Sequence, residues 1–363
     1  MLLTPVLYSY VSTMSQPSSL PLSVRTVEWI RVNHGAWLVD TVEHYWYSWN
    51  APAPGGPALK ALPRVGAGLP AVHRVARHEH AYRPPRIVPL IGPALPSEGV
   101  WNPTGRLVAG SPGVLVTTFR PDRSYPRIVA YVAWIDHTRT QLALYPGRYE
   151  PPGASPRGPM EVPPGQRRRL LATFNSGFTY NDGHGGFAVD GQTVTPLRQG
   201  IGTVVESLGG SVDVRSWCCG PRLPRSLVLA RQNLPLIVDH GRPNPLLSNG
   251  SLWGSTLGNA VRVWRSALGV DRRGNLVYAA ADLQTAQTLA ALMIHAGAVR
   301  AMELDINPEW PSFNLYAAPG GVGAVKLVPN DQQSATRYLV PDDRDFFAVY
   351  GRDFHASATV PFR

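Results

Sequence analysis

The chain of 363 residues is poor in charge, in lysine and in cysteine. Charged residues make up 16% of it, where about 25% is usual for a globular domain. Its two cysteines, Cys218 and Cys219, are adjacent, which excludes a disulfide framework and a four-ligand zinc site. We expect two reduced thiols, with a strained vicinal disulfide as the alternative. No uncharged apolar run approaches about 20 residues, so the sequence predicts no membrane-spanning helix.

The shortage of lysine means that the net charge of +10 comes from arginine. Only Lys60 and Lys326 are lysines among the 34 basic residues. Codon bias in a GC-rich, actinobacterial-like genome explains this composition, and an anionic partner is the alternative explanation. The arginines are scattered and are not interleaved with aromatic residues, so we expect no nucleic-acid partner.

Glycine and proline, by contrast, are abundant, with 35 and 36 residues, and this argues against a helical bundle. Short β-branched runs bounded by turn residues predict strands and hairpins. One helix is predicted at 282–296, capped by Asp282 and ended by Gly297. The sequence therefore predicts an α+β fold with few helices and a mixed, mostly antiparallel sheet. The predicted strands and hairpins lie at 113–119, 127–135, 140–145, 170–174, 186–194, 226–239, 261–281, 298–304 and 346–350.

Changes of composition divide the chain into four parts. We expect a tryptophan-rich N-terminal extension at 1–50, a Pro/Gly/Ala-rich linker or draped loop at 51–103, the main domain at 104–354 and a tail at 355–363. Within the extension, 1–23 is expected to be a frayed lead. Residues 23–49 are expected to form one compact element with Ser23 as its N-cap.

Four of the ten tryptophans lie in this extension. They are Trp29, Trp37, Trp46 and Trp49. We expect them to anchor the extension onto the main domain. The alternative is a sugar-stacking or partner surface, because tryptophan is enriched where an apolar face has a wet edge.

Three groups of residues in the main domain could carry chemistry. In the first, Asn175, Ser176 and Gly177 follow a predicted strand, and Gly185 and Gly186 come shortly after. Glycine-rich turns let backbone N–H groups approach an anion closely. An ordinary wide loop is the alternative for this stretch.

The other two groups lie on later strands. Small residues follow Arg265 on its strand face, so its planar guanidinium has room to bind a phosphate; a solvent-facing arginine is the alternative. Glu303 and Asp305 share a strand face roughly 6.6 Å apart. Such a pair could perform acid/base catalysis or hold a divalent cation, and a salt-bridged strand end is the alternative.

In this order and spacing, the three groups resemble the phosphodiester glycosidase domain family. That family includes the N-acetylglucosamine-1-phosphodiester α-N-acetylglucosaminidase ("uncovering enzyme") domain and bacterial envelope proteins. The stretch Asn175–Phe178 is similar to its first motif, 265–269 matches R-(S/T)-A-(I/L)-G, and Leu304–Asp305 begins its L-D-G-G-G-S motif. The resemblance covers roughly 110–352. The chain departs from the family at Ile306–Ser312, where two prolines and bulkier residues replace the glycines.

The resemblance implies a hydrolase that cleaves a sugar-1-phosphodiester in a cell-envelope glycan or a related anionic glycoconjugate. Asp305 would act in acid/base catalysis or hold a cation, with Glu303 in support. Phosphate would be held by Arg265 and by the loops listed here: Asn175, Ser176, Gly177, Gly185 and Gly186. The altered 306–312 loop favours the alternative, a catalytically inactive glycan-binding or scaffold protein on the same fold.

Two further expectations come from the family rather than from the residues. A divalent cation such as calcium is a possible cofactor, with Asp305 as the candidate ligand. From the family we expect an exported or cell-envelope protein. The cytoplasm is the alternative, because the visible N-terminus lacks the positively charged start of a signal peptide.

Overall fold

The computed structural model describes residues 3–50, 53–57, 59–63, 65, 82–153, 158–254, 262–329 and 333–352. The tail predicted at 355–363 lies outside these residues. The α-helices are α1 (Leu3–Ser15), α2 (Leu22–Ile30), α3 (Ala36–Trp49), α4 (Tyr180–Gly183) and α5 (Ala286–His295). None of the helices in the described ranges has the length and apolar character needed to cross a membrane.

The strands form three large sheets and one small one. The eight-stranded sheet has the order β1-β4-β5-β16-β15-β17-β13-β14. It consists of β1 (Asn102–Pro103), β4 (Val114–Phe119), β5 (Ala130–Ile135), β16 (Leu276–Gln284), β15 (Val263–Val270), β17 (Arg300–Ile306), β13 (Leu236–Asp239) and β14 (Arg242–Pro243).

The other two large sheets have five strands each. One consists of β11 (Val212–Ser216), β10 (Gly202–Ser207), β12 (Leu227–Gln232), β8 (Phe187–Val189) and β9 (Gln192–Thr195). The other consists of β19 (Ala324–Lys326), β18 (Phe313–Tyr316), β7 (Leu170–Asn175), β20 (Phe346–Gly351) and β6 (Thr140–Tyr145). The small sheet pairs β2 (Leu107–Val108) with β3 (Ser111–Pro112).

Every strand pairing recorded in the described part is antiparallel. Helices are few, so the predicted α+β class is confirmed. The main core lies where the three large sheets meet, and each contributes buried residues such as Leu268, Phe174 and Val204. A second core lies under α5, which covers one face of the eight-stranded sheet.

The predicted helix is present but begins later than expected. Strand β16 continues through Gln284, so Asp282 belongs to the strand and is not the N-cap. Thr285 is the cap, and its hydroxyl accepts a hydrogen bond from the backbone N–H of Thr288. In return, the backbone N–H of Thr285 donates to Oγ1 of Thr288, which completes a capping box. This reciprocal pair satisfies two otherwise unpaired donors, whereas Asp282 accepts from the N–H of Leu283.

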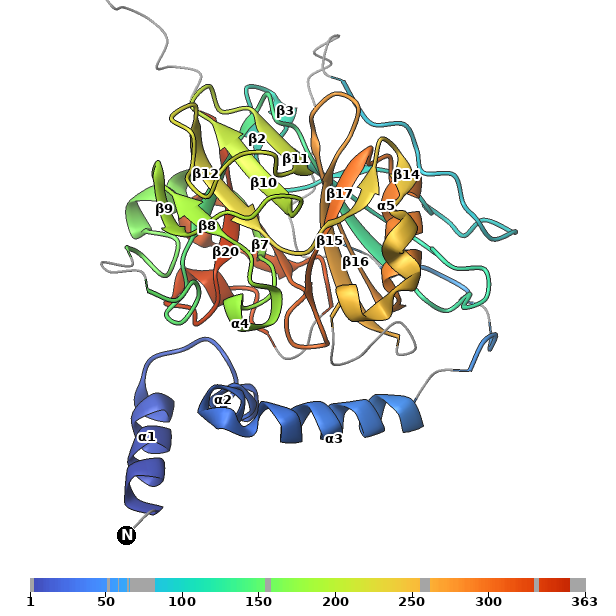
Figure 1. Ribbon diagram of the computed structural model, residues 1–363. Coiled ribbons are helices and arrows are strands. Elements are labelled where there is room, and N and C mark those ends of the chain that lie inside the picture. The colour runs from blue at the N-terminus through green and yellow to red at the C-terminus, as the bar shows by residue number, and fades with distance from the viewer. Residues whose placement is uncertain are drawn as a thin grey trace, which may run out of the picture.

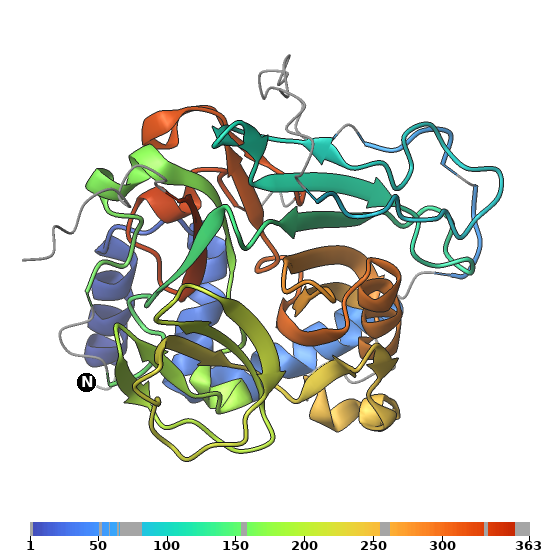
Figure 2. The ribbon, with the colours of Figure 1, turned by 90° about the horizontal axis from the view of Figure 1, so that it is seen from above.

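The N-terminal extension is more helical than predicted. Residues 3–15, expected to be a frayed lead, form α1, and α2 begins after Pro21 rather than at a Ser23 cap. Between α2 and α3 the chain is kinked at Arg31–Gly35, where Asn33 and His34 have non-helical backbone angles and His34 has φ 68°. Figures 1 and 2 show α1, α2 and α3 gathered on one side of the strands. We call residues 3–49 the N-terminal helical segment.

The expectation that tryptophans anchor the extension onto the main domain is wrong for Trp37, Trp46 and Trp49, and Trp29 contacts residues of the extension itself. Trp29 is half-buried against Tyr10, with ring centroids 5.3 Å apart. Trp37, Trp46 and Trp49 are exposed by 69%, 64% and 86%. Their rings therefore do not hold the extension onto the strands.

Candidate functional site

Three strand ends that the sequence analysis singled out come together in the fold. The Nδ2 group of Asn175, at the end of β7, donates to Oγ of Ser266 on β15 at 3.0 Å. That hydroxyl donates to the carbonyl of Asp305 on β17 at 2.8 Å. The backbone N–H of Asp305 donates to the carbonyl of Ser176 at 3.0 Å. The motif stretches are thus neighbours in space, although 91 and 39 residues separate the bonded pairs.

Within this junction, Asn175 is fully occupied by protein contacts. Its Nδ2 donates to the Ser176 carbonyl and to Ser266, and its Oδ1 accepts from Tyr278 Oη and the Ser312 N–H, both at 3.0 Å. The residue is buried. Its side chain joins two sheets and has no capacity left for a phosphate.

Arg265 and Glu303, predicted to bind phosphate and to support catalysis, form a fully enclosed ion pair. Their closest atoms, Nη1 and Oε1, are 2.6 Å apart, and both side chains are 0% exposed. Arg265 also donates to the carbonyls of Gln284 and Trp253. Burial raises the pKa of Glu303, although the arginine opposes this rise. In this arrangement Arg265 faces protein rather than a ligand, and the alternative of a solvent-facing arginine is also wrong. For Glu303, the alternative of a salt-bridged strand fits the structure.

The glycines predicted to hold phosphate lie where other segments of the chain pass close to their backbone. A Cβ at Gly185 would lie 2.2 Å from the carbonyl oxygen of Gln232, and one at Gly186 would lie 2.5 Å from that of Pro196. A Cβ at Gly177 would lie 2.9 Å from the side chain of Asn233. These residues are glycines because other segments approach them closely, and they are not among the residues that line the pocket described next.

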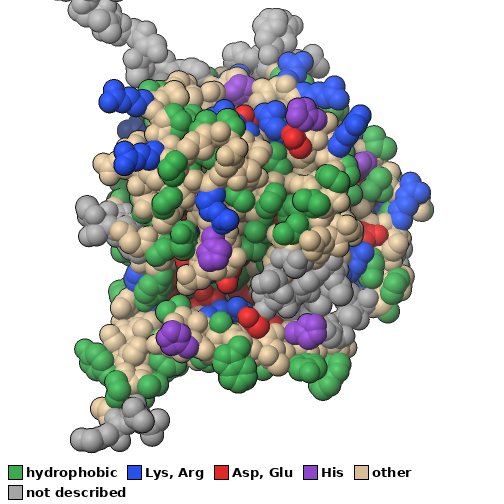
Figure 3. Space-filling view, in the orientation of Figure 1, with side chains coloured by type: hydrophobic (Ala, Val, Ile, Leu, Met, Phe, Trp, Pro, Cys, Tyr) green, Lys and Arg blue, Asp and Glu red, His purple; other side chains and the backbone are tan. Residues whose placement is uncertain are grey.

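A pocket of about 310 Å³ lies between the strands and the N-terminal helical segment. Asp305 is the predicted site residue that lines it. The other lining residues outside the N-terminal helical segment are Phe178, Asp182, Leu234, Leu252, Gly254, Ile306, Asn307, Glu309, Trp310 and Arg344. The helical segment supplies Ser23, Val24, Val27, Glu28, Arg31 and Glu43. Figure 3 shows acidic and basic side chains in the hollow between these two parts.

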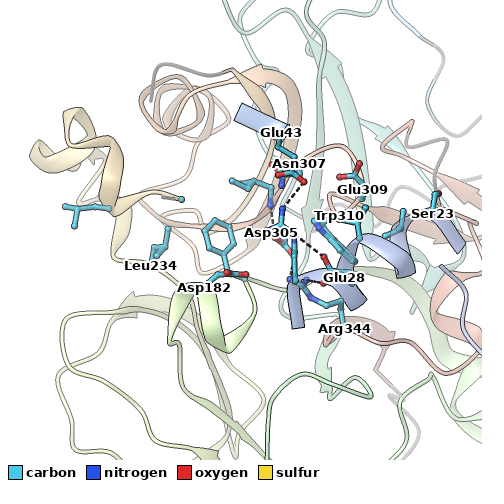
Figure 4. A pocket seen from close by; sticks show the side chains of 17 residues that line it. Ser23, Glu28, Glu43, Asp182, Leu234, Asp305, Asn307, Glu309, Trp310 and Arg344 are labelled. Carbon is cyan, nitrogen blue, oxygen red and sulfur yellow. Dashed lines mark hydrogen bonds and ion pairs between the residues drawn. The ribbon is translucent and has the colours of Figure 1, made fainter. Parts of the chain in front are cut away.

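The centre of the pocket is a charged triad formed by Arg344, Asp305 and Glu28 (Figure 4). Nη2 of Arg344 donates to Oδ2 of Asp305 at 2.5 Å, and Nη1 donates to Oε2 of Glu28 at 3.4 Å. Burial raises the pKa of Asp305 to about 7, although Arg344 favours the ionised carboxylate. Burial also raises the pKa of Glu28, again against the pull of Arg344. Near neutral pH, Asp305 is therefore able both to give and to accept a proton.

The loop that departs from the family pattern contributes side chains to this pocket. Trp310 stacks against Arg344, whose guanidinium carbon is 4.3 Å from the ring centroid. Glu309 also lines the pocket, and burial raises its pKa. Asn307 has φ 75°, a left-handed conformation that asparagine tolerates better than most residues. Residues 306–312 therefore fill this part of the pocket with side chains, whereas glycines would leave the backbone exposed to a ligand.

The N-terminal helical segment is held over the pocket by the residues just before β20. Ser18 and Ser19 donate to Asp343 and Asp342 at 3.0 and 2.9 Å. Leu20, Val24 and Trp310 form a small apolar cluster beside these bonds. The pocket is consequently bounded on one side by helices that begin the chain.

Sequence reasoning missed Arg344 and its neighbours. The stretch 342–345 reads Asp-Asp-Arg-Asp immediately before a correctly predicted strand, and all four residues are buried. Four consecutive charged residues are a detectable signal in a chain that is only 16% charged. Buried charges require partners, so this stretch could have been recognised as part of an ionic cluster.

The residues around Asp305 do not fit a calcium site. Its Oδ2 accepts from Arg344, and its Oδ1 accepts from the N–H of Ile306 at 3.0 Å. A cation at this carboxylate would lie beside a guanidinium, which repels it. Among the residues that the structure describes, no group of three or more His, Cys, Asp or Glu side chains is arranged to hold a metal.

No protein-family model matches the sequence, and no curated protein matches it. Among solved structures, the chain is similar to a zebrafish N-acetylglucosamine-1-phosphodiester alpha-N-acetylglucosaminidase catalytic domain, auto-inhibited by its pro-peptide. The identity is 12%, the TM-score is 0.43, and the match covers 66% of this chain and 82% of that one. A hypothetical protein from Synechocystis is similar at 13% identity and a TM-score of 0.39, covering 66% of this chain and 62% of that one. At these identities and scores, neither structure informs the roles of individual residues.

Proposed function

We propose that the pocket around Asp305 is the active site of a hydrolase that cleaves a sugar-1-phosphodiester in an envelope glycan or a related glycoconjugate. The observation that carries the proposal is the state of Asp305. A buried carboxyl with a pKa of about 7, in a pocket beside a guanidinium, is suited to general acid–base chemistry at neutral pH. The substrate class comes from the motif resemblance.

The reaction breaks the bond between the anomeric carbon and the bridging oxygen, which leaves with the phosphate. Water supplies the oxygen that bonds to the anomeric carbon and loses a proton in doing so. A phosphate leaves readily as an anion, so the step that needs help is the loss of this proton. Ionised Asp305 would accept it, and the positive charge of Arg344 would stabilise the departing phosphate.

For this to happen, the phosphate must take the place of Glu28 at Nη1 of Arg344. The Glu28 carboxylate, at 3.4 Å, now occupies that donor. At 3.4 Å this contact is longer than the 2.5 Å contact between Arg344 and Asp305, and 27% of the Glu28 side chain is accessible. Glu28 is therefore the partner of Arg344 that a phosphate would displace.

A second candidate function is glycan binding without hydrolysis. The observation that favours it is the sign of the charge around the pocket. Two arginines face five carboxyl groups there, and this balance disfavours an anionic phosphodiester. The five are Glu28, Glu43, Asp182, Asp305 and Glu309.

The experiment is sugar release by the full chain from N-acetylglucosamine-1-phosphodiesters at pH 7, with substrate binding measured by calorimetry. We expect Asp305→Asn to lower the release rate by at least about 100-fold, as for loss of a general base. Asp239→Asn, an exposed carboxylate outside the pocket lining, is the matched control and should leave the rate unchanged. Binding without release by the natural chain would favour the second candidate, and neither binding nor release would exclude both.

Two further proposals concern the domains of the chain and the cellular location of the protein. We propose that 104–354 is the catalytic domain, that 1–50 is an extension that bounds its pocket, and that 51–103 drapes over the surface. An ion pair between Glu98 and Arg120, 2.8 Å apart and buried, supports the draped arrangement. We propose an exported or cell-envelope location because the motif resemblance extends to envelope proteins.

A further inference from the structure

Helix α3 has two different faces. The side toward the strands carries Val39, which is buried, and Asp40 and Glu43, which form ion pairs with Arg31 at 2.9 and 2.8 Å. At about 100° per residue, an arc of about 100° that begins next to Val39 and turns away from Asp40 and Glu43 is made up of apolar and aromatic side chains. We call it the aromatic face of α3; it consists of Leu38, Val42, Tyr45, Trp46 and Trp49, all of them exposed.

This face is exposed although it contains two of the three tryptophans of the helix. Tyr45 and Trp49 contact each other, with ring centroids 6.4 Å apart, and in the described part of the chain no strand covers them. Figure 3 shows apolar side chains along the lower margin, where Figure 1 places α1 and α3. Leu7, Tyr8 and Val11 form a similar exposed arc on α1. Contiguous exposed apolar surface of this kind marks an interaction site.

Charge and composition identify the partner. The aromatic face of α3 has no charged side chain, and residues 1–24 contain no Asp, Glu, Lys or Arg at all. Such a surface is complementary to uncharged headgroups and offers nothing to attract an anionic lipid. Tryptophan and tyrosine, three of the five residues, are the types enriched at membrane–water interfaces. A helix with one apolar and one charged face lies flat in that interface.

Two other occupants fit less well. A stable dimer interface involves about 20–30 residues from each partner, whereas the arcs of α3 and α1 together supply eight side chains. A sugar platform needs polar groups that fix the hydroxyls, and the face offers only the Tyr45 hydroxyl. We therefore propose that the aromatic face of α3 binds a lipid surface with uncharged headgroups.

The proposal places the pocket near that surface, whichever chemistry the pocket performs. Glu43, on the inner side of α3, lines the pocket. With the aromatic face in the headgroups, the pocket lies about 10 Å away, one helix diameter. A substrate attached to a lipid would be within reach there.

The test uses the full chain and extruded phosphatidylcholine vesicles in a co-sedimentation assay. We expect the natural chain to sediment with the vesicles. Substituting Leu38→Ser, Trp46→Ser and Trp49→Ser together should lower the partition coefficient at least about tenfold. The matched control replaces three exposed apolar residues outside the N-terminal helical segment, by Leu208→Ser, Leu246→Ser and Val322→Ser. This control should bind the vesicles as the natural chain does.

Brominated phosphatidylcholine gives a second readout on the natural chain, which avoids any effect of substitution on folding. We expect it to quench tryptophan fluorescence. Failure to sediment, absence of quenching, equal binding by the substituted chain, or a requirement for anionic lipid would each overturn the proposal. So would a concentration-dependent dimer that the three substitutions abolish, which would assign the face to a second copy of the chain.

Discussion

Two arginine–carboxylate pairs on neighbouring strands and loops have the same chemistry but different surroundings. Arg265 and Glu303 are 2.6 Å apart and fully enclosed. Arg344 and Asp305 are 2.5 Å apart, but they border a pocket and share a third partner, Glu28, from the other end of the chain. The two pairs have the same residue types and nearly the same distance between charged atoms. What separates a structural ion pair from a candidate site is whether the pair borders a pocket and whether a second carboxylate competes for the arginine.

The largest expected effect comes from breaking the enclosed pair. Arg265→Met would leave Glu303 buried without its partner, which costs about 3–5 kcal/mol of unfolding free energy. Arg344→Met should cost less than half as much, because Asp305 borders the pocket and accepts a proton near neutral pH. Urea unfolding at pH 7 measures both losses. Equal losses would contradict the distinction, and Glu303→Leu added to Arg265→Met should restore most of the stability.

The pocket pair should make stability depend on pH. Because the pKa of Asp305 is raised from 3.8 to about 7, the folded state holds its proton more tightly than the unfolded state. This contribution to stability is complete below pH 3.8 and is lost as the pH rises through 7. Asp305→Asn should remove it, so the change in unfolding free energy between pH 4 and pH 7.5 should shrink by about 2–4 kcal/mol. Chemical unfolding at several pH values gives this slope, and a slope unchanged by the substitution would contradict the assignment.

A smaller effect is expected at the third partner. Glu28→Gln removes one contact between the N-terminal helical segment and the strands, worth about 0.5–1 kcal/mol. Backbone amides of α2 should then exchange hydrogen about 2- to 5-fold faster. Glu43→Gln is the matched control, because that carboxylate also lines the pocket but pairs with Arg31 inside the segment. Faster exchange in the control to the same extent would show that Glu28 does not hold the segment.

Local patterns were sufficient to predict most of the elements around the site. The hairpin of β15 and β16, strand β17 and strand β20 all lie where alternation and turn residues indicated. The start of α5 was misplaced because Asp282 resembles an N-cap, while the tertiary pairing of β16 extends the strand past it. The hairpin predicted at 186–194 is present as β8 and β9, and its turn residues Asp190 and Gly191 both have positive φ.

The site itself could be predicted only in part. Strand alternation correctly indicates which residues share a face with Arg265, but it does not reveal that Glu303, Gln284 and Trp253 enclose that face. The partners of Arg344 lie 39 and 316 residues away in the sequence. No periodicity connects such distant residues, so the pocket emerges only when the chain is folded.

The most direct test of the difference between the two pairs is the protonation of Asp305. Carbon-13 labelling of aspartate carboxyls, with the resonance assigned by its loss in Asp305→Asn, gives the pKa from a titration of chemical shift. The raised pKa predicts a midpoint at about 7. A midpoint near the ordinary value of 3.8 would mean that the carboxylate stays ionised, and Asp305 would then be a structural partner of Arg344 rather than a catalyst.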